Sequence, residues 1–146
     1  MRLDKQTDYS LRVLMFLAAN RHRLSTIAEI ARRFEISRAH LIKVVYLLGK
    51  AGIIETARGR SGGIRLAANG QSIRVGDVVR RMESELAPVE CLRSSGGHCL
   101  ITPCCRLKGV LVKAMAAFLA VLDEYTIADL VRDNDALARL LEERAA

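Results

Sequence analysis

The chain has 146 residues and a formal net charge of +7, enough for one compact domain with a helical extension but not for two large independent domains. Its first residues lack the apolar run of a signal peptide, and no stretch approaches the roughly 18 uninterrupted apolar residues of a membrane span. We therefore expect a cytoplasmic protein, in whose reducing surroundings clustered cysteines act as metal ligands or redox groups rather than as a structural disulfide framework.

Positive charge is concentrated in the N-terminal half. Residues 1–65 carry thirteen Lys/Arg against five Asp/Glu, whereas residues 66–146 carry ten against eleven. This asymmetry favours a polyanion such as nucleic acid as the partner of the N-terminal half, although the charge could also serve solubility alone.

Three amphipathic helices are expected first in chain order. Thr7 is the candidate N-cap of a helix over residues 7–19, which ends at a polar break over 20–24. Thr26 and Glu29 form a capping box for a second, short helix that ends near Phe34. After a tight turn, Ser37 caps a third helix. The apolar positions expected to face the core are Leu11, Leu14, Met15, Ala18, Ile27, Ile30, Ala31, Phe34, Leu41, Val44, Val45 and Leu48.

The third helix is expected to end at Gly52 and to be followed by a hairpin. Residues 53–56 and 64–66 are extended segments around a basic, glycine-rich tip over 57–63,. Two short helices joined by a turn and followed by such a ribbon indicate a mainly α winged helix-turn-helix DNA-binding domain over residues 1–86. A further helix over 73–84 completes it, with Val75, Val78, Val79 and Met82 turned inward.

The C-terminal half is expected to form a cysteine loop over 87–105 and a helical segment with a tail over 106–146. From Arg106 an apolar seam recurs in steps of four and three, as expected for a helix that packs on another helix. The seam favours homodimerisation, although it could instead dock on the N-terminal domain. A short helix around 127–131 and a charged tail follow. The seam consists of Leu107, Leu111, Ala114, Phe118, Val121 and Tyr125.

Candidate DNA contacts lie on the third helix and on the tip of the wing. Arg38 and Lys43 suit guanine or phosphate. Ser37 could do no more than cap its helix, and His40 could be an ordinary surface histidine. Arg58 and Arg60 flank Gly59, where guanidinium groups can enter a narrow minor groove; these six residues are the predicted DNA-binding set.

All four cysteines fall within fifteen residues, as Cys91-x7-Cys99-x5-Cys105 with Cys104 beside the last. The spacing lacks paired Cys-x2-Cys knuckles, which disfavours structural zinc, and loops of this length suit an iron-sulfur cluster. Cys105 opens the long helix, whose free amides favour an anionic ligand, so Cys105 is a better candidate ligand than Cys104. A disulfide switch remains the alternative.

Motifs along nearly the whole chain resemble the winged-helix iron-sulfur transcription regulators, and among them the nitric-oxide-sensing repressors. They are Leu3-x3-Thr7-Asp8-Tyr9-x-Leu11-Arg12, Ala51-Gly52-Ile53, Arg58-Gly59-Arg60-Ser61-Gly62-Gly63-Ile64-Arg65-Leu66, Ile73-Arg74-Val75-Gly76-Asp77-Val78-Val79, Cys99-x-Ile101-Thr102-Pro103-x-Cys105-Arg106-Leu107 and Tyr125-Thr126-x-Ala128-Asp129-Leu130.

The resemblance implies a cluster held by Cys91, Cys99 and Cys105 and by Asp8 of the partner subunit. Arg12, four residues after Asp8 on the same expected helix, could pair with it,. A 4Fe-4S cluster is favoured and 2Fe-2S is possible. Asp8 could equally be an acid favoured by the helix dipole with no other duty. His98 is a possible substitute ligand.

The resemblance further implies a dimeric repressor that loses DNA affinity when nitric oxide nitrosylates its cluster. Regulators of cluster biogenesis in the same family carry a histidine ligand three residues after the last cysteine, where this chain has Lys108. An iron-status regulator of that kind and a cluster-free thiol-switch repressor are the alternatives. An enzyme is not expected, because the chain shows no nucleophile-base arrangement and no phosphate-binding glycine loop.

Overall fold

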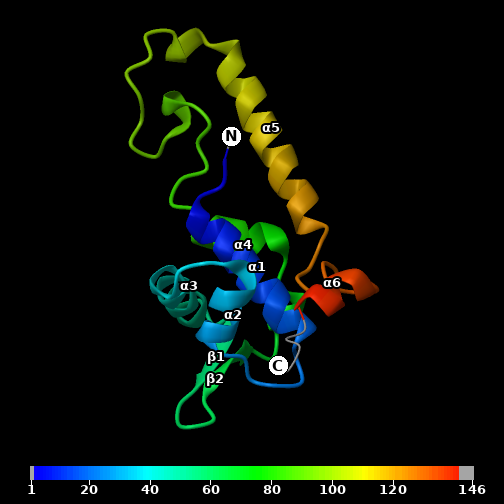
Figure 1. Ribbon diagram of the computed structural model, residues 1–146. Helices are drawn as coiled ribbons and strands as arrows, with labels where there is room; N and C mark the ends of the chain where they lie inside the picture. The colour runs from blue at the N-terminus through cyan, green and yellow to red at the C-terminus, as the bar shows by residue number, and fades with distance from the viewer. Residues whose placement is uncertain (1, 142–146) are drawn as a thin grey trace.

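A computed structural model describes residues 2–141 of the chain. The elements in this range are α1 (Lys5–Ala19), α2 (Ile27–Phe34), α3 (Arg38–Lys50), β1 (Ile54–Ala57), β2 (Gly63–Leu66), α4 (Val75–Met82), α5 (Arg106–Asp123), α6 (Asp135–Leu141) and the short 3-10 helices η1 (Gly70–Ser72), η2 (Glu90–Leu92) and η3 (Thr102–Cys104). Helices α1 to α4 and the hairpin form a compact body, from which α5 projects as an arm (Figure 1). None of the helices described has the length and hydropathy of a membrane-spanning segment.

Helix α1 begins two residues earlier than the sequence predicts. Asp4, in extended conformation, occupies the N-cap position, so the assignment of Thr7 as N-cap was wrong. The reason is tertiary: the Asp4 amide donates to Glu83 Oε1 at 2.8 Å, and Gln6 Nε2 donates to the Met82 carbonyl, which ties the start of α1 to the end of α4. Thr7 is fully buried instead, and its Oγ1 has no hydrogen-bond partner among the described residues.

Helices α2 and α3 form the predicted helix-turn-helix. Thr26 and Glu29 make the reciprocal capping box, and Ser37 Oγ accepts the His40 amide. Between them Glu35 adopts φ +54°, the left-handed conformation that reverses the chain,. Helix α3 ends at Lys50, two residues before the predicted end, and Gly52 takes φ +70° in the turn that leads to the hairpin.

The wing is a two-stranded antiparallel hairpin in which Ile54 pairs with Leu66 and Ala57 with Gly63. Its inner residues Ile54 and Ile64 are buried against the body. Ile64 also exchanges two backbone hydrogen bonds with Ser25, so the loop before α2 pairs with β2 through an isolated antiparallel β-bridge. The winged helix-turn-helix expected from the sequence is therefore confirmed.

The core is filled by one face of each body helix. α1 packs against α3 and α4, and α3 packs against β1. Of the inward positions predicted on α3 and α4, all are buried, because apolar side chains three and four residues apart share one face of a helix,. The fully buried side chains include Val13, Leu14, Phe16, Ile30, Leu41, Leu48, Val78, Val79 and Ile127.

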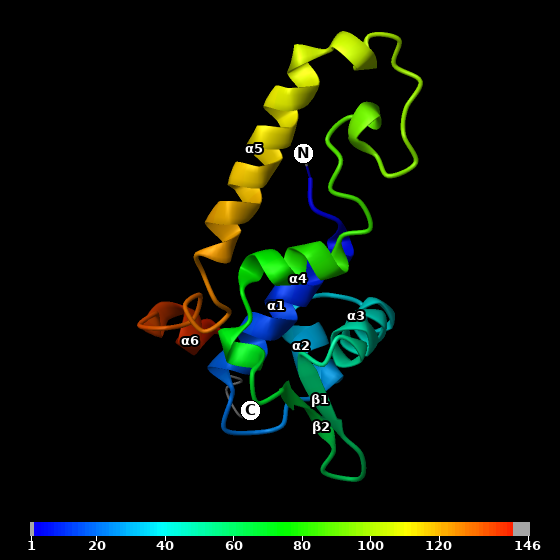
Figure 2. The same cartoon turned by 180° about the vertical axis from the view of Figure 1, so that it is seen from behind.

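The base of α5 is clasped to α4. The Asp123 carboxylate accepts two hydrogen bonds from the Arg80 guanidinium, and the Asp123 carbonyl accepts one from Arg74. The carboxylate lies so close to Gly76 that any side chain there would collide with it. The hydrogen bonds from Arg80 lower the pKa of Asp123 and raise that of Arg80. These contacts join the C-terminal end of α5 to α4, and the rest of α5 projects away from the body (Figure 2).

The segment after α5 differs from the prediction. Residues 127–131 lie in a run of turns rather than in a helix, and the helix of this region is α6. The amides of Ile127 and Ala128 donate to the carbonyls of Ile73 and Gln71, hydrogen bonds to another segment that replace those of a local helix. The charged tail was expected to follow residue 131, but its described part contains helix α6. Its last residues, 142–146, lie outside the described residues.

No residue of α5 is buried, and its exposed apolar seam differs in part from the predicted one. Leu111 and Phe118 are half-buried, whereas Val110 and Ala117 are exposed. Helical periodicity allows either set, and packing on the body selects between them. The exposed seam follows steps of three and four, with small residues at its centre: Leu107, Val110, Ala114, Ala117 and Val121.

Candidate nucleic-acid interface and cluster site

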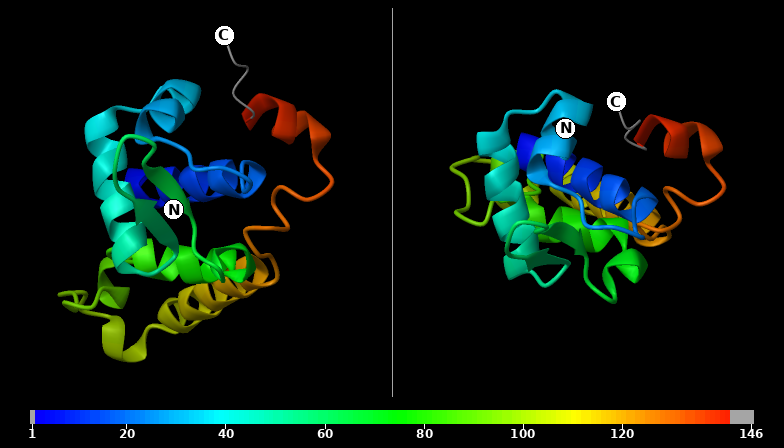
Figure 3. Two further views of the ribbon diagram at one scale, coloured as in Figure 1. Left: turned by 90° about the horizontal axis from the view of Figure 1, so that it is seen from below. Right: turned by 60° about the horizontal axis from the view of Figure 1, so that its bottom comes forward.

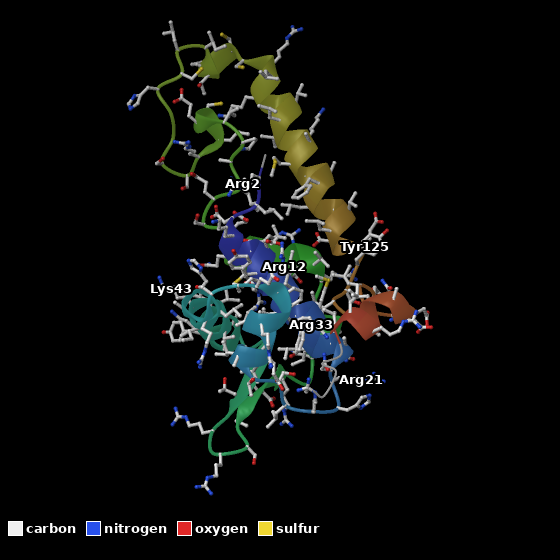
Figure 4. All side chains as sticks on the ribbon, in the orientation of Figure 1. Arg2, Arg12, Arg21, Arg33, Lys43 and Tyr125 are labelled. Atoms are coloured by element: carbon white, nitrogen blue, oxygen red, sulfur yellow. The ribbon has the colours of Figure 1, made fainter. Side chains whose placement is uncertain are left out.

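The first turns of α3 present the predicted polar residues to solvent. Arg38, His40 and Lys43 are exposed, and Figure 4 shows Lys43 on the side of α3 away from α1 and α2. Ser37 caps the helix through its Oγ, which also lies 3.2 Å from His40 Nδ1. The His40 ring stands 6.1 Å from the ring of Tyr9 on α1. Ser37 and His40 thus shape the start of α3, while Arg38 and Lys43 are available to a partner.

The tip of the wing places two arginines beyond the end of the hairpin. Arg58 and Arg60 are both exposed, and Gly59 between them has φ +110°. A Cβ on Gly62 would lie 2.5 Å from the Ala57 carbonyl oxygen, so the tip closes tightly. Because the wing runs beside α3 (Figure 3), the two basic elements face the same side of the body. They form one surface that suits the backbone and grooves of a duplex.

Two exposed residues of α3 were missed at the sequence level. Ile42 is 54% exposed and Tyr46 is 67% exposed, one helical turn apart on the outer face. The signal was present, because both fall outside the stripe that fills the core.

The chain between Cys91 and Cys99 folds back on itself. The Gly96 amide donates to the Arg93 carbonyl, and Gly96 has φ +73°. Glu85 accepts from the Ser94 amide at 3.0 Å and so holds the turn from the root of the loop. A Cβ on Gly97 would lie 2.9 Å from the Glu90 oxygen and 3.1 Å from the Cys91 nitrogen. The turn therefore returns the chain toward the backbone of Cys91.

Successive turns connect Cys99 to Cys105. The Thr102 amide donates to the Cys99 carbonyl, and the Cys105 amide is 3.5 Å from the Thr102 carbonyl oxygen. Thr102 Oγ1 is buried, yet it finds no hydrogen-bond partner in the described chain. This hydroxyl lies between Cys99 and Cys105 in the sequence and has a hydrogen bond left to donate.

Cys105 and Cys104 differ in their surroundings. Cys105 is half-buried at the N-cap position of α5, and the first turn of that helix contains no acidic residue. Cys104 is exposed, and its thiol donates to the Ile101 carbonyl at 3.5 Å. Cys91 and Cys99 are half-buried like Cys105, and all four are free thiols.

Asp8 lies on α1, apart from the cysteines of its own chain. Its two carboxylate oxygens accept from Arg12 Nε at 3.0 Å and Nη2 at 2.8 Å. Asp8 also lines a groove with Arg2, Lys5 and Tyr9. Its side chain remains 44% exposed, which leaves it accessible to a second subunit.

Within residues 2–141 no three Cys, His, Asp or Glu side chains lie close enough together to hold a metal ion. The structure thus gathers the cysteines on one loop without uniting them with each other, with His98 or with Asp8. The chemistry of the donors still suits a cluster, because three half-buried free thiols lie on one loop, and the Thr102 hydroxyl of that loop has no partner in the described chain. This loop and the wing lie at opposite ends of the molecule (Figures 1 and 2).

Comparison with known proteins identifies similar transcription regulators. The family model Rrf2, described as an iron-dependent transcriptional regulator, matches residues 3–133. The chain is 50% identical to the HTH-type transcriptional regulator NsrR of Bacillus subtilis (strain 168), over 97% of this chain and 98% of that protein. It is 51% identical to the regulator of the same name from Geobacillus kaustophilus (strain HTA426), over 99% of both.

Solved structures give the same result. The structure of CymR, the global cysteine regulator of B. subtilis, matches with a TM-score of 0.72 at 25% identity, covering 90% of this chain and 96% of that one. T. potens IscR matches with a TM-score of 0.71 at 26% identity, covering 94% and 90%. The resemblance drawn from the sequence motifs is thereby confirmed at the level of the family.

Proposed function

Because the chain belongs to the Rrf2 family of transcriptional regulators, we propose that it is a homodimeric, cytoplasmic repressor that holds an iron-sulfur cluster and releases DNA in response to nitric oxide. Membership makes it a DNA-binding regulator and not an enzyme. The cluster, the signal and the dimer are the proposal. Its support is the strong likeness to proteins named NsrR and the cysteine loop described above.

The observation that carries the cluster proposal is the surroundings of the three half-buried thiols. Gly97 lets the loop approach Cys91, Thr102 offers an unused hydroxyl, and Cys105 opens a helix without a competing acid. Cys91, Cys99 and Cys105 would hold the cluster, with 4Fe-4S favoured over 2Fe-2S. The bound cluster would supply the iron with which nitric oxide reacts.

The fourth ligand in this proposal is Asp8 of the partner subunit. In the described chain Arg12 binds both oxygens of Asp8, which fixes the orientation of the carboxylate at the surface of α1,. A carboxylate ligand would tie the reading head of one subunit to the cysteine loop of the other. Its release would free the two heads from the spacing that a palindromic site requires.

Within each subunit, a movement of α5 would be transmitted to the DNA-binding domain through the contacts at the C-terminal end of that helix. Asp123 is bound to Arg80 of α4, and the Val75 amide donates to the Tyr125 carbonyl at 2.9 Å. Figure 4 shows Tyr125 at the end of the arm, where it meets the body. Since α4 packs against both α5 and α1, a shift of α5 would displace α1, the helix that carries Asp8.

Anaerobic purification tests the proposal. We expect a coloured protein with iron and sulfide in stoichiometric amounts, bleached by nitric oxide with loss of binding to a promoter duplex. Colourless protein that binds DNA equally well before and after cluster reconstitution would overturn it. A holoprotein that ignores nitric oxide but responds to iron supply would instead be the iron-status regulator.

Replacing Asp8 with Ala tests the fourth ligand. We expect an altered cluster spectrum or faster cluster loss, with the winged-helix body intact. Arg12→Ala is the comparison variant: it leaves the carboxylate in place without the partner that orients it, so it should disturb the cluster less than Asp8→Ala does. An unchanged spectrum in Asp8→Ala would reduce Asp8 to an acid that pairs with Arg12 on α1.

A cluster-free thiol switch is the second candidate, favoured by the exposed thiol of Cys104 beside Cys105. It predicts that oxidation of the colourless protein forms a disulfide between one of these cysteines and Cys91 or Cys99, and changes DNA affinity. Mass spectrometry of oxidised protein decides between a disulfide and none.

A further inference from the structure

Helix α3 carries a short apolar strip on the face that the body leaves uncovered. It consists of Ile42, 54% exposed, and Tyr46, 67% exposed. The opposite face of α3 fills the core with Leu41, Val44, Val45 and Leu48, so the strip adds nothing to the core. An exposed isoleucine is also a poorer helix former than alanine or lysine. Stability of α3 therefore does not explain Ile42.

Basic and small side chains surround the strip. Arg38 lies one turn before Ile42, Lys43 follows it, and the small Ala39 is three residues before it; all three are exposed. The positive charges match the phosphates of a duplex, and the small neighbour leaves room for a base edge to approach. A duplex held by Arg38 and Lys43 would thus bring base edges against the middle of α3.

The chemistry of the major groove limits what Ile42 can recognise there. Bases present hydrogen-bonding groups along its floor, and their one apolar group is the C5 methyl of thymine. We propose that Ile42 contacts thymine methyl groups, so that operator choice depends on thymine opposite the middle of α3. This inference rests on the DNA-binding function and assigns it a specificity-determining residue, with Tyr46 bordering the contact.

The test removes single methyl groups from the DNA. Duplexes that bind the anaerobically purified protein are enriched from a random pool, and each thymine of the half-site is replaced in turn by deoxyuridine. Burial of one methyl-sized group corresponds to about fourfold in affinity. We expect the protein to lose about this factor at one or two thymines of each half-site.

Two variants assign that loss to a residue. Ile42→Ala should bind the thymine duplex more weakly and bind the thymine and deoxyuridine duplexes equally at the sensitive positions. Val112→Ala is the matched control, since Val112 is a similarly exposed aliphatic residue, 49% exposed, on the α5 arm. It should keep the full response to deoxyuridine. Arg60→Ala should weaken binding to both duplexes alike and also keep that response.

The outcomes separate the inference from the function on which it rests. If Ile42→Ala still loses affinity at every position where the unchanged protein does, Ile42 does not read the methyl groups. If deoxyuridine has no effect on the unchanged protein, methyl recognition itself is overturned while DNA binding stands. If no duplex is enriched, the DNA-binding function fails, and the inference fails with it.

Discussion

At the tip of the wing, Arg60 is exposed beside Gly59 and projects beyond the paired strands. A guanidinium there can neutralise a phosphate or enter the minor groove, and either interaction releases counterions from DNA. Arg60→Ala should therefore lower DNA affinity and make its salt dependence shallower, by about one unit of slope for each phosphate that is no longer neutralised. Binding measured over a series of salt concentrations checks this. An unchanged slope would remove Arg60 from the interface, and an unchanged melting temperature shows that the fold is intact.

One of the four cysteines is more exposed to solvent than the other three. Cys104 is exposed, whereas Cys91, Cys99 and Cys105 are half-buried. Cys104→Ala should leave the iron and sulfide content of the anaerobically purified protein unchanged, while Cys105→Ala should abolish both, because a cluster needs each of its thiolates. Equal iron loss in the two variants would show that the adjacent thiols had been assigned the wrong roles.

At the scale of elements, the clasp between α4 and α5 predicts an acid response. Arg80 lowers the pKa of Asp123 in the folded protein below its ordinary value of 3.8. The folded state then binds a proton less readily than the unfolded state, so the pair's stabilisation is complete above pH 3.8 and is lost as pH falls through the lower, folded pKa,.

We therefore expect Asp123→Asn to lose less stability than the unchanged protein as the pH falls from about 5 to about 2. Thermal or urea unfolding across this range measures the effect. Glu124→Gln, at the neighbouring exposed position, is the matched control and should follow the unchanged protein. Parallel acid curves for Asp123→Asn and the unchanged protein would contradict a role for the clasp in stability.

At the scale of the whole molecule, the α5 arm exposes a seam that only a partner would cover. Val110 and Val121 are 60% and 54% exposed along it, and an apolar strip of this kind marks an interaction surface. If α5 forms the proposed dimer interface, the double substitution Val110→Glu and Val121→Glu should yield a monomer in analytical ultracentrifugation and lower affinity for a palindromic duplex. Val112→Glu, half a helical turn away from the seam, should stay dimeric. A dimeric double variant would place the interface elsewhere.

The local elements could be predicted from sequence wherever their causes are local. The capping box of Thr26 and Glu29, the cap at Ser37 and the apolar faces of α3 and α4 depend on residues three or four positions apart. The start of α1 could not be predicted, because Glu83 binds the Asp4 amide from 79 residues away. For the same reason residues 127–131 looked helical, although Ile127 bonds to Ile73 across the fold.

The sequence by itself determined the winged helix, the candidate ligands and the family, because each can be predicted from residue types and from spacings of a few residues. Only the tertiary structure decided which side of α5 is exposed and how Gly97 returns the loop toward the backbone of Cys91. These features depend on how elements pack against one another. A helix of period 3.6 offers several apolar faces, and burial against the body selects the one that is hidden.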